Sequence, residues 1–183
     1  GLTLRPAQWG DLNAVVDLIR DVLTADGDAV SAVTPAELER EWQTEGFVLE
    51  TDVFVVTNTD GRVVGYEEFV NRHAHAALQG DGYVHPDFRG LGIGTTLLQA
   101  LEERARKEME LAEPDLRVYI INGMSAADKS AREIHESEGY KLIRHHWMME
   151  ANLTEPPKVI PFPAGIELRP FDKNLHDRLV FEA

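Results

Sequence analysis

A glycine-rich segment between a predicted strand and a predicted helix has the composition of an anion-binding loop. Glycines occupy positions 90, 92 and 94, after a β-forming run that ends at Pro86 and before an amphipathic pattern. The first amide groups of a helix have no partner within the helix, and the helix dipole is positive at that end. Because glycine has no side chain to keep a phosphate away from the backbone, this loop can bind a pyrophosphate through several N–H groups.

Other phosphate-binding patterns fit this segment less well. The third glycine comes one residue too early for the dinucleotide pattern Gly-x-Gly-x-x-Gly, and the Lys-Ser/Thr pair of a P-loop is absent. The glycines are also compatible with a tight strand-to-helix turn that binds nothing. The spacing alone therefore leaves a phosphate site and a simple turn open.

The residue pattern also predicts the elements around the loop. Strands are expected at residues 3–5, 53–57, 62–70, 75–84, 116–121 and about 140–149. Helices are expected at about residues 10–24, after the capping box Thr34–Glu37, from the loop to before Pro114, and after residues 125–128. Consecutive antiparallel strands come first, and strand–helix–strand alternation follows. This order predicts an α/β (α+β) fold, in which a mixed, mostly antiparallel twisted sheet has helices on both faces.

The C-terminal part of the chain differs from the rest. Residues 155–163 are rich in proline, and residues 165–170 (Gly-Ile-Glu-Leu-Arg-Pro) repeat the pattern of residues 1–6 (Gly-Leu-Thr-Leu-Arg-Pro). We therefore expect a domain over residues 1–152, a linker over 153–164 and, over 165–183, the first strand and partial helix of a truncated second copy of the fold. An ordinary C-terminal strand that extends the sheet is the alternative.

The surroundings of the glycines resemble a known motif. Residues 84–94 read Val-His-Pro-Asp-Phe-Arg-Gly-Leu-Gly-Ile-Gly and are followed by a helix with Leu97 and Leu98 in its first turn. This arrangement resembles the acetyl-CoA-binding motif of the GNAT superfamily of N-acetyltransferases, and the element order is similar over about residues 2–150. The resemblance implies the GNAT fold, acetyl-CoA as co-substrate, and a free backbone N–H in the preceding strand that polarises the thioester carbonyl.

The resemblance also implies individual cofactor-binding residues. By position these are Tyr83 and Val84 for the thioester and pantetheine, Arg89, Gly90, Leu91, Gly92, Ile93, Gly94 and Thr95 for the pyrophosphate, and Asn122 for a further cofactor contact. Lys129 and Arg132 are near enough in sequence to meet coenzyme phosphates, or they are solvated helix charges.

One position departs from the family's pattern. The family often has a tyrosine four residues after an alanine in the last helix, and here Ala131 is followed at that distance by His135. His135 could donate a proton to the departing sulfur at neutral pH, or it could be a packed imidazole. Both interpretations remain open, and Tyr140 is expected in the core.

The general base is chosen among several polar residues. Glu67 and Glu68 are adjacent in a predicted strand, so at most one of them faces the cleft. Glu68 is the first candidate and His85 the second, with Asp81 as a further possibility. Each of these residues could instead be an ordinary exposed polar side chain.

Composition and charge exclude several classes of function. The chain has 18 Lys and Arg against 32 Asp and Glu, a net charge of −14 that disfavours nucleic-acid binding and suits a cationic acceptor. The absence of cysteine excludes thiolate nucleophiles and disulfides.

The pairs His73/His75 and His145/His146 lack further ligands, so no metal site is predicted. Without a long apolar run or a signal segment, we expect a cytoplasmic protein with no membrane partner.

The sequence therefore predicts an acyltransferase that moves an acetyl group from acetyl-CoA to a primary amine of a small molecule by direct attack. The alternative is a non-catalytic GNAT domain that binds acetyl-CoA or has only a structural role. It would belong to a tandem protein similar to mycothiol synthase, whose second GNAT domain is catalytic. The complete glycine loop favours the enzyme, and His135 in the tyrosine position favours the alternative. Neither a particular acceptor nor an oligomeric state follows from the sequence.

Overall fold

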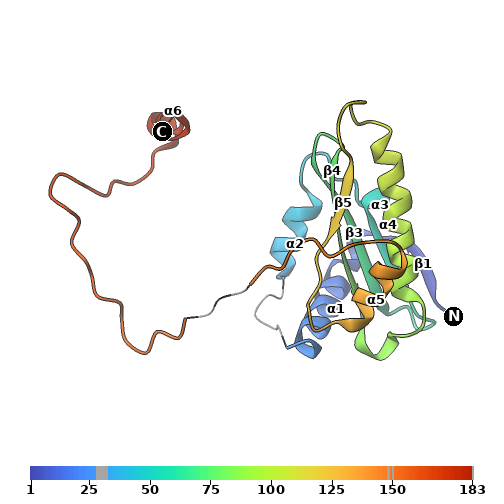
Figure 1. Cartoon of the computed structure of the whole chain (residues 1–183). Coiled ribbons are helices and arrows are strands. Elements are labelled where there is room, and N and C mark those ends of the chain that lie inside the picture. The colour runs from blue at the N-terminus through green and yellow to red at the C-terminus, as the bar shows by residue number, and fades with distance from the viewer. Residues whose placement is uncertain (28–32, 148, 150, 183) are drawn as a thin grey trace. The chain divides into compact units, whose positions relative to one another are not determined.

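The computed structural model describes residues 1–27, 33–147, 149 and 151–182 (Figure 1). Its internal contacts divide the chain into two units, Gly1–Leu142 and Ile143–Ala183. The domain boundary at residue 152 stays a prediction.

The described part of the first unit is built on a five-stranded sheet with the strand order β1-β2-β3-β4-β5. The strands are β1 (Thr3–Pro6), β2 (Val53–Thr57), β3 (Val63–His73), β4 (Ala77–Val84) and β5 (Tyr119–Asn122). Neighbours from β1 to β4 pair antiparallel, whereas β4 and β5 pair parallel. The predicted mixed, mostly antiparallel sheet is confirmed.

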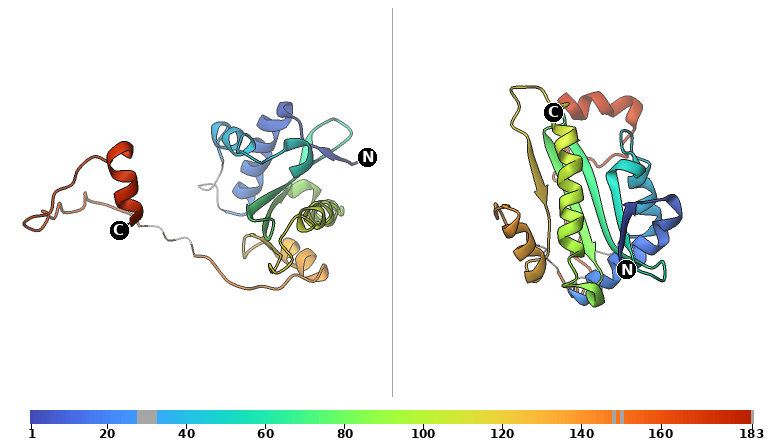
Figure 2. Two further views of the ribbon diagram at one scale, coloured as in Figure 1. Left: turned by 90° about the horizontal axis from the view of Figure 1, so that it is seen from above. Right: turned by 90° about the vertical axis from the view of Figure 1, so that its right-hand side faces the viewer.

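Helices cover both faces of this sheet, as predicted (Figure 2, left). On one side α1 (Leu12–Ala25) and α2 (Pro35–Trp42) pack on β2 and β3, and on the other side α4 (Ile93–Met109) and α5 (Lys129–Ser137) form a second core. The predicted capping box begins α2, because Thr34 N–H donates to the Glu37 carboxylate and Glu37 N–H donates to Thr34 Oγ1. Two features were not predicted, a short helix α3 (Leu49–Asp52) and a 3₁₀ turn at Pro86–Phe88.

Alternation along β3 sends neighbouring side chains to opposite faces of the sheet. Tyr66 packs with α1 and α2, whereas Phe69 packs with α4. Because residues two apart in a strand share a face, Glu68 lies on the α1/α2 side and Glu67 on the α4 side. The two carboxyl groups therefore lie on opposite faces of the sheet.

A partly buried ion-pair network ties α4 to the sheet. Arg104 donates from Nε to Asp52 Oδ1 (2.7 Å) and from a terminal nitrogen to Glu108 Oε2 (2.6 Å), and its guanidinium lies 4.4 Å from the centre of the Phe69 ring. Glu108 also contacts His75 Nδ1 at 2.5 Å. Burial raises the pKa of Glu108, but its hydrogen bonds to His75 and Arg104 outweigh that effect, so the pKa is lowered. The network therefore holds the nearly inaccessible carboxylate of Glu108 in the ionised form.

The prediction of a strand over about residues 140–149 is wrong for the part of it that the structure describes. Residues 140–147 and 149 have no helix or strand, and Leu142, Ile143 and Trp147 are exposed. A strand needs a partner for its backbone N–H and C=O groups. Here β5 is the last strand in the sheet order, and the segment does not pair with it.

The second unit contains the helix α6 (Lys173–Glu182), where an amphipathic helix was predicted. The strand expected within residues 165–170 is not formed, because no neighbouring strand pairs with it in the described residues. Residues 153–164 have no helix or strand, and their role as a linker stays a prediction. The interpretation of residues 165–183 as a truncated repeat stays a prediction. None of the helices in the described part of the chain combines the length and hydrophobicity that a bilayer crossing requires.

Candidate active site

The sheet splits at the end of β5. The pairing between β4 and β5 runs from Ala77 opposite Tyr119 to Gly80 opposite Asn122 and stops there, whereas β4 continues to Val84 beside β3. The last four residues of β4 therefore have a partner strand on one side only. The gap that begins at Gly80 and Asn122 is called the fork below.

Backbone groups of β4 point into this fork. His85 N–H donates to the Val64 carbonyl, so the backbone of His85 faces β3, and the Ala76 carbonyl accepts from Tyr119, so the backbone of Ala76 faces β5. Because these directions alternate along a strand, the N–H groups of Gly82 and Val84 point to the fork. The predicted Val84 is thus well placed, whereas the backbone of Tyr83 faces β3. Gly82 was not predicted, although glycine within a strand signals a close approach to the backbone.

The glycine loop presents bare amide groups beside the fork. Gly90 (φ +79°) and Gly92 (φ +80°) adopt left-handed backbone conformations, and added Cβ atoms there would meet no described atom within 4 Å. The first backbone hydrogen bond of α4 runs from Thr96 N–H to the Gly92 carbonyl. The N–H groups of the three preceding residues, 93–95, therefore have no acceptor within the helix. Gly94 instead allows α4 and α5 to pack closely, because a Cβ there would lie 2.9 Å from Ile134 Cδ1 of α5.

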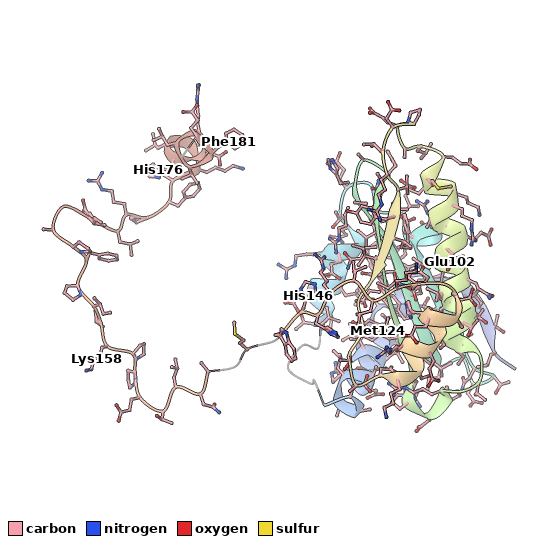
Figure 3. The ribbon with its side chains drawn as sticks, viewed as in Figure 1. Glu102, Met124, His146, Lys158, His176 and Phe181 are labelled. Atoms are coloured by element: carbon pink, nitrogen blue, oxygen red, sulfur yellow. The ribbon has the colours of Figure 1, made fainter. Side chains whose placement is uncertain are left out.

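A cavity of about 310 Å³ joins the loop to the fork and is called the first cavity. It brings together nine of the ten predicted cofactor-binding residues, Tyr83, Val84, Arg89, Gly90, Gly92, Ile93, Gly94, Thr95 and Asn122. The tenth, Leu91, lies in the loop with its side chain 60% exposed. Figure 3 labels Met124, a further residue of the cavity lining from the segment between β5 and α5.

Arg89 is already paired with protein carboxylates. Its guanidinium lies 3.1 Å from Asp26 Oδ1, just after α1, and 3.6 Å from Asp128 Oδ2, the N-cap of α5. The residue therefore joins the loop to two helices. Any interaction of Arg89 with a phosphate would compete with these pairs.

His135 has both ring nitrogens engaged. Asn122 Nδ2 lies 2.9 Å from His135 Nε2, and His135 Nδ1 lies 2.8 Å from the Ala131 carbonyl. Because an amide nitrogen can only donate and a carbonyl can only accept, this arrangement fits a neutral ring with its proton on Nδ1. It agrees with the packed-imidazole interpretation. Tyr140 packs edge-on against this ring and joins the α4 core, as expected.

Glu67, which the sequence analysis ranked behind Glu68, lines the first cavity. Its side chain is almost inaccessible, and no described donor reaches its Oε1. Burial, followed by the nearby charges of Asp81 and Glu68, raises the pKa of Glu67 well above its usual range. Adjacent glutamates do face opposite sides, but each of them lines a cavity.

A second cavity of about 500 Å³ lies on the α1/α2 side of the sheet. Its lining includes Glu37, Glu41, Glu68 and Asp81 against a single cation, Arg72. Tyr83 lines both cavities, so they approach each other at the free part of β4. Acidic groups thus gather on one side of the fork and bare amide groups on the other.

Two carboxyl groups of the second cavity titrate near neutrality. Glu68 and Asp81 lie directly opposite each other on β3 and β4. Burial, opposed by a hydrogen bond from Tyr66 and supported by the charge of Asp81, raises the pKa of Glu68 to about 7. Burial also raises the pKa of Asp81 to about 6, although Tyr83 donates a hydrogen bond to it. Such a pair can accept a proton near physiological pH.

His85, the second candidate base, lies outside both cavities. It is buried, its Nε2 lies 2.7 Å from the Arg62 guanidinium, and its ring packs edge-on against Phe88. The 3₁₀ turn that follows it directs the ring away from the fork, and its Nδ1 accepts from Asp87 N–H. The structure therefore places Glu68, but not His85, in the lining of a cavity, and only Glu68 is considered further as a base.

The remaining charged candidates have local partners or lie on the surface. Arg132 pairs with Glu136 at 2.7 Å on the exposed face of α5, and Lys129 is exposed. Among the described residues, no three His, Asp or Glu side chains gather as metal ligands would.

Comparison with known proteins identifies the family. A model of the acetyltransferase (GNAT) family matches residues 16–120, more than half of the chain. The matched segment includes β4, the glycine loop and α4. The glycine loop and the free part of β4 therefore lie within the matched segment, whereas Asn122 and His135 lie outside it.

Individual relatives agree with this match. The mycothiol acetyltransferase of Geodermatophilus obscurus is 28% identical over 162 residues, 86% of this chain and 47% of the relative. A GCN5-related N-acetyltransferase from Sphaerobacter thermophilus is similar with a TM-score of 0.84 and 34% identity, over 99% of this chain and 56% of that one. The chain thus spans about half the length of these two relatives. A phosphinothricin acetyltransferase from Sinorhizobium meliloti, solved with acetyl-CoA, shares the fold with a TM-score of 0.60 and 24% identity, over 78% of this chain and 76% of that one.

Proposed function

The chain belongs to the acetyltransferase (GNAT) family, and from this premise we propose that it transfers an acetyl group from acetyl-CoA to a primary amine of a small molecule. The observation that carries the proposal is the position of the bare amide groups at the start of α4, directly beside the fork. The amide groups at the start of α4 can bind an anion, and the fork can receive an extended, uncharged chain. A pyrophosphate linked to a pantetheine arm has these two parts.

The residues of the first cavity fit such a cofactor. The N–H groups of Ile93, Gly94 and Thr95 donate to the pyrophosphate, and the open space above Gly90 and Gly92 allows it to approach the backbone. When bound, acetyl-CoA supplies an acetyl group that is activated as a thioester. The N–H groups of Gly82 and Val84 are available to donate to the carbonyl oxygen on which negative charge develops during acyl transfer.

Glu68 is proposed as the general base, with Asp81 as its coupled neighbour. The amine must lose a proton to attack, and a carboxylate with a pKa of about 7 holds that proton near neutral pH. Tyr66 donates to Glu68 Oε2 at 2.6 Å and fixes the orientation of the carboxyl group. The amine would approach from the second cavity at Tyr83, which lines both cavities. His135 is not needed as an acid in this scheme.

The acceptor is proposed to be cationic. Four acidic residues line the second cavity against a single arginine, Arg72, which donates a hydrogen bond to the uncharged Gln79 at 2.8 Å. A positively charged molecule would therefore gain electrostatic attraction on entering the cavity. The net charge of −14 adds attraction at longer range.

We also propose that the chain is the N-terminal half of a protein with two GNAT-like domains. It spans about half of the two relatives described above. In addition, α6 follows residues 165–170 as α1 follows the similar residues 1–6 of the first unit. The second domain would then be a partner of the first within one chain.

The pyrophosphate assignment is tested at Leu91, because a substitution of Gly92 would also strain a left-handed backbone. Leu91→Asp places a negative charge in the loop, and we expect it to weaken acetyl-CoA binding by about 10- to 100-fold through repulsion. Leu91→Asn, which is similar in shape but uncharged, is the matched control and should bind like the wild type. Calorimetry measures both affinities. Equal affinities of the two variants would contradict the assignment.

Acetyl transfer itself is tested by thiol release with a panel of amines, in which cationic amines should react fastest. The measurement uses this chain and a version extended past Ala183. Tight acetyl-CoA binding without thiol release in both proteins would contradict the enzyme and support a non-catalytic binding domain.

A further inference from the structure

The carboxyl group of Glu67 lies at the fork, where β5 leaves β4. Glu67 is opposite Gly82 in the register of β3 and β4, and a Cβ on Gly82 would overlap Glu67 Oε2. A Cβ on Gly80 would lie 2.9 Å from Glu67 Oε1. Two glycines of β4 therefore leave the space into which this carboxyl group extends.

The amide oxygen of Asn122 reaches the same place from β5. Asn122 Oδ1 lies 2.8 Å and Glu67 Oε1 2.9 Å from the position that a Cβ on Gly80 would occupy, so both oxygens border the same small space. Both oxygens are buried, and neither has a donor among the described residues. Two acceptors that share a buried site repel each other unless a proton lies between them.

The contacts of the Asn122 side chain indicate which group at the fork can carry this proton. Its amide nitrogen is directed to His135 Nε2, and His135 Nδ1 is directed to the Ala131 carbonyl. Asn122 therefore uses its nitrogen toward α5 and presents only its oxygen at the fork. Glu67 is the group at this position that can carry an additional proton.

We propose that Glu67 is a neutral carboxylic acid that donates a hydrogen bond to Asn122 Oδ1 and so fixes the spacing of β4 and β5 at the fork. One proton then satisfies both buried oxygens and completes a chain from Glu67 through Asn122 and His135 to the backbone of α5. Glu67 is thus a positioning residue for the N–H groups of Gly82 and Val84. This positioning role rests on the proposed function, whereas the protonation state does not.

The surroundings of Glu67 are consistent with a neutral acid. The ionisable groups that act on it are Glu68 on β3, Asp81 on β4 and Tyr140 after α5, and Tyr140 in turn lies near Glu102 on α4 and His135 on α5. Negative charges predominate, and α4 places apolar Leu101 against Gly80. No described cation pairs with the carboxyl group, so ionisation would leave a buried charge without compensation.

The protonation state is tested by infrared spectroscopy at about pH 8.5, where Glu68 and Asp81 are largely ionised. We expect a protonated carboxyl band in the wild type that is lost in Glu67→Gln and kept in Glu133→Gln, a control at an exposed site on α5. A spectrum without a band specific to Glu67 would overturn the proposal. This measurement needs no cofactor, so it stays decisive if the chain does not bind acetyl-CoA.

Thermal unfolding provides a second test that is independent of activity. A carboxyl group whose pKa is raised by folding keeps its proton in the folded state while the unfolded chain loses it. Stability therefore falls as pH rises above the ordinary carboxyl range, and the loss levels off above the folded-state pKa. We expect the Tm of Glu67→Gln to rise relative to the wild type as pH increases from about 5 to 8. A difference in Tm that does not change with pH would contradict the neutral acid.

The positioning role is tested by acetyl-CoA affinity. Gln keeps a donor at this position and should bind within about threefold of the wild type, whereas Glu67→Ala removes the donor and should weaken binding by about tenfold or more. Equal affinities of Glu67→Gln and Glu67→Ala would overturn the positioning role. If the wild type itself fails to bind, the proposed function fails, and the infrared and thermal results still decide the protonation state.

Discussion

Replacing Glu68 by Gln is expected to lower kcat/KM for the amine by about 10²- to 10⁴-fold, the usual contribution of a positioned general base. Glutamine can still accept the hydrogen bond from Tyr66, so the fold and acetyl-CoA affinity should be retained. In the wild type, kcat/KM should rise with pH around 7, because burial and the charge of Asp81 raise the pKa of Glu68 to about that value. The variant should lack this rise. Steady-state kinetics between about pH 5 and 9 measures both effects.

A variant of Asp81 distinguishes the base from its neighbour. Asp81→Asn removes the negative charge opposite Glu68, so it should move the rise in kcat/KM to lower pH without abolishing activity. Glu45→Gln, at an exposed site after α2, should behave like the wild type. If Asp81→Asn abolished the pH-dependent rise and Glu68→Gln kept it, the base would be Asp81.

Removing Arg104 is expected to lower the free energy of unfolding by about 3–5 kcal/mol, the usual cost of breaking a buried ion pair. Arg104→Ala leaves Asp52 and Glu108 without their shared cation, and these side chains are only 4% and 8% exposed. It also removes the contact with the Phe69 ring. Urea-induced unfolding at pH 7 measures the change.

Arg106→Ala is the matched control on the same helix. Arg106 pairs with Glu102 one turn away, but its side chain is 65% exposed. A solvent-exposed pair of this kind contributes about 0.3–0.5 kcal/mol. Similar losses in the two variants would contradict the view that burial of Asp52 and Glu108 makes Arg104 important.

Local signals predicted most of the fold because their physical basis lies within a few residues. The capping box of Thr34 and Glu37 needs only one helical turn, and the glycines at 90 and 92 reflect a backbone conformation that other residues rarely adopt. The loop residues that line the first cavity could be grouped from the sequence for the same reason, since they are nearly consecutive in the chain.

Features that depend on distant neighbours could not be predicted. Residues 140–149 include several apolar and aromatic residues, which favour a strand, but a strand forms only where another strand pairs with it. His85 lies beside the loop in sequence, yet the turn after it directs the ring toward Arg62. The position of Glu67 in the first cavity could not be predicted, because its neighbours, the glycines of β4 and Asn122, come from other strands. The glycines at 80 and 82 were the available signal, since they mark a strand that another group approaches closely.

A crystal structure of the chain with acetyl-CoA tests the central claim most directly. The account predicts pyrophosphate oxygens within about 2.7–3.2 Å of the N–H groups of Ile93, Gly94 and Thr95, with the pantetheine arm between β4 and β5 and the thioester oxygen facing Gly82 or Val84. A cofactor bound elsewhere, or a pyrophosphate held by side chains away from the start of α4, would contradict it.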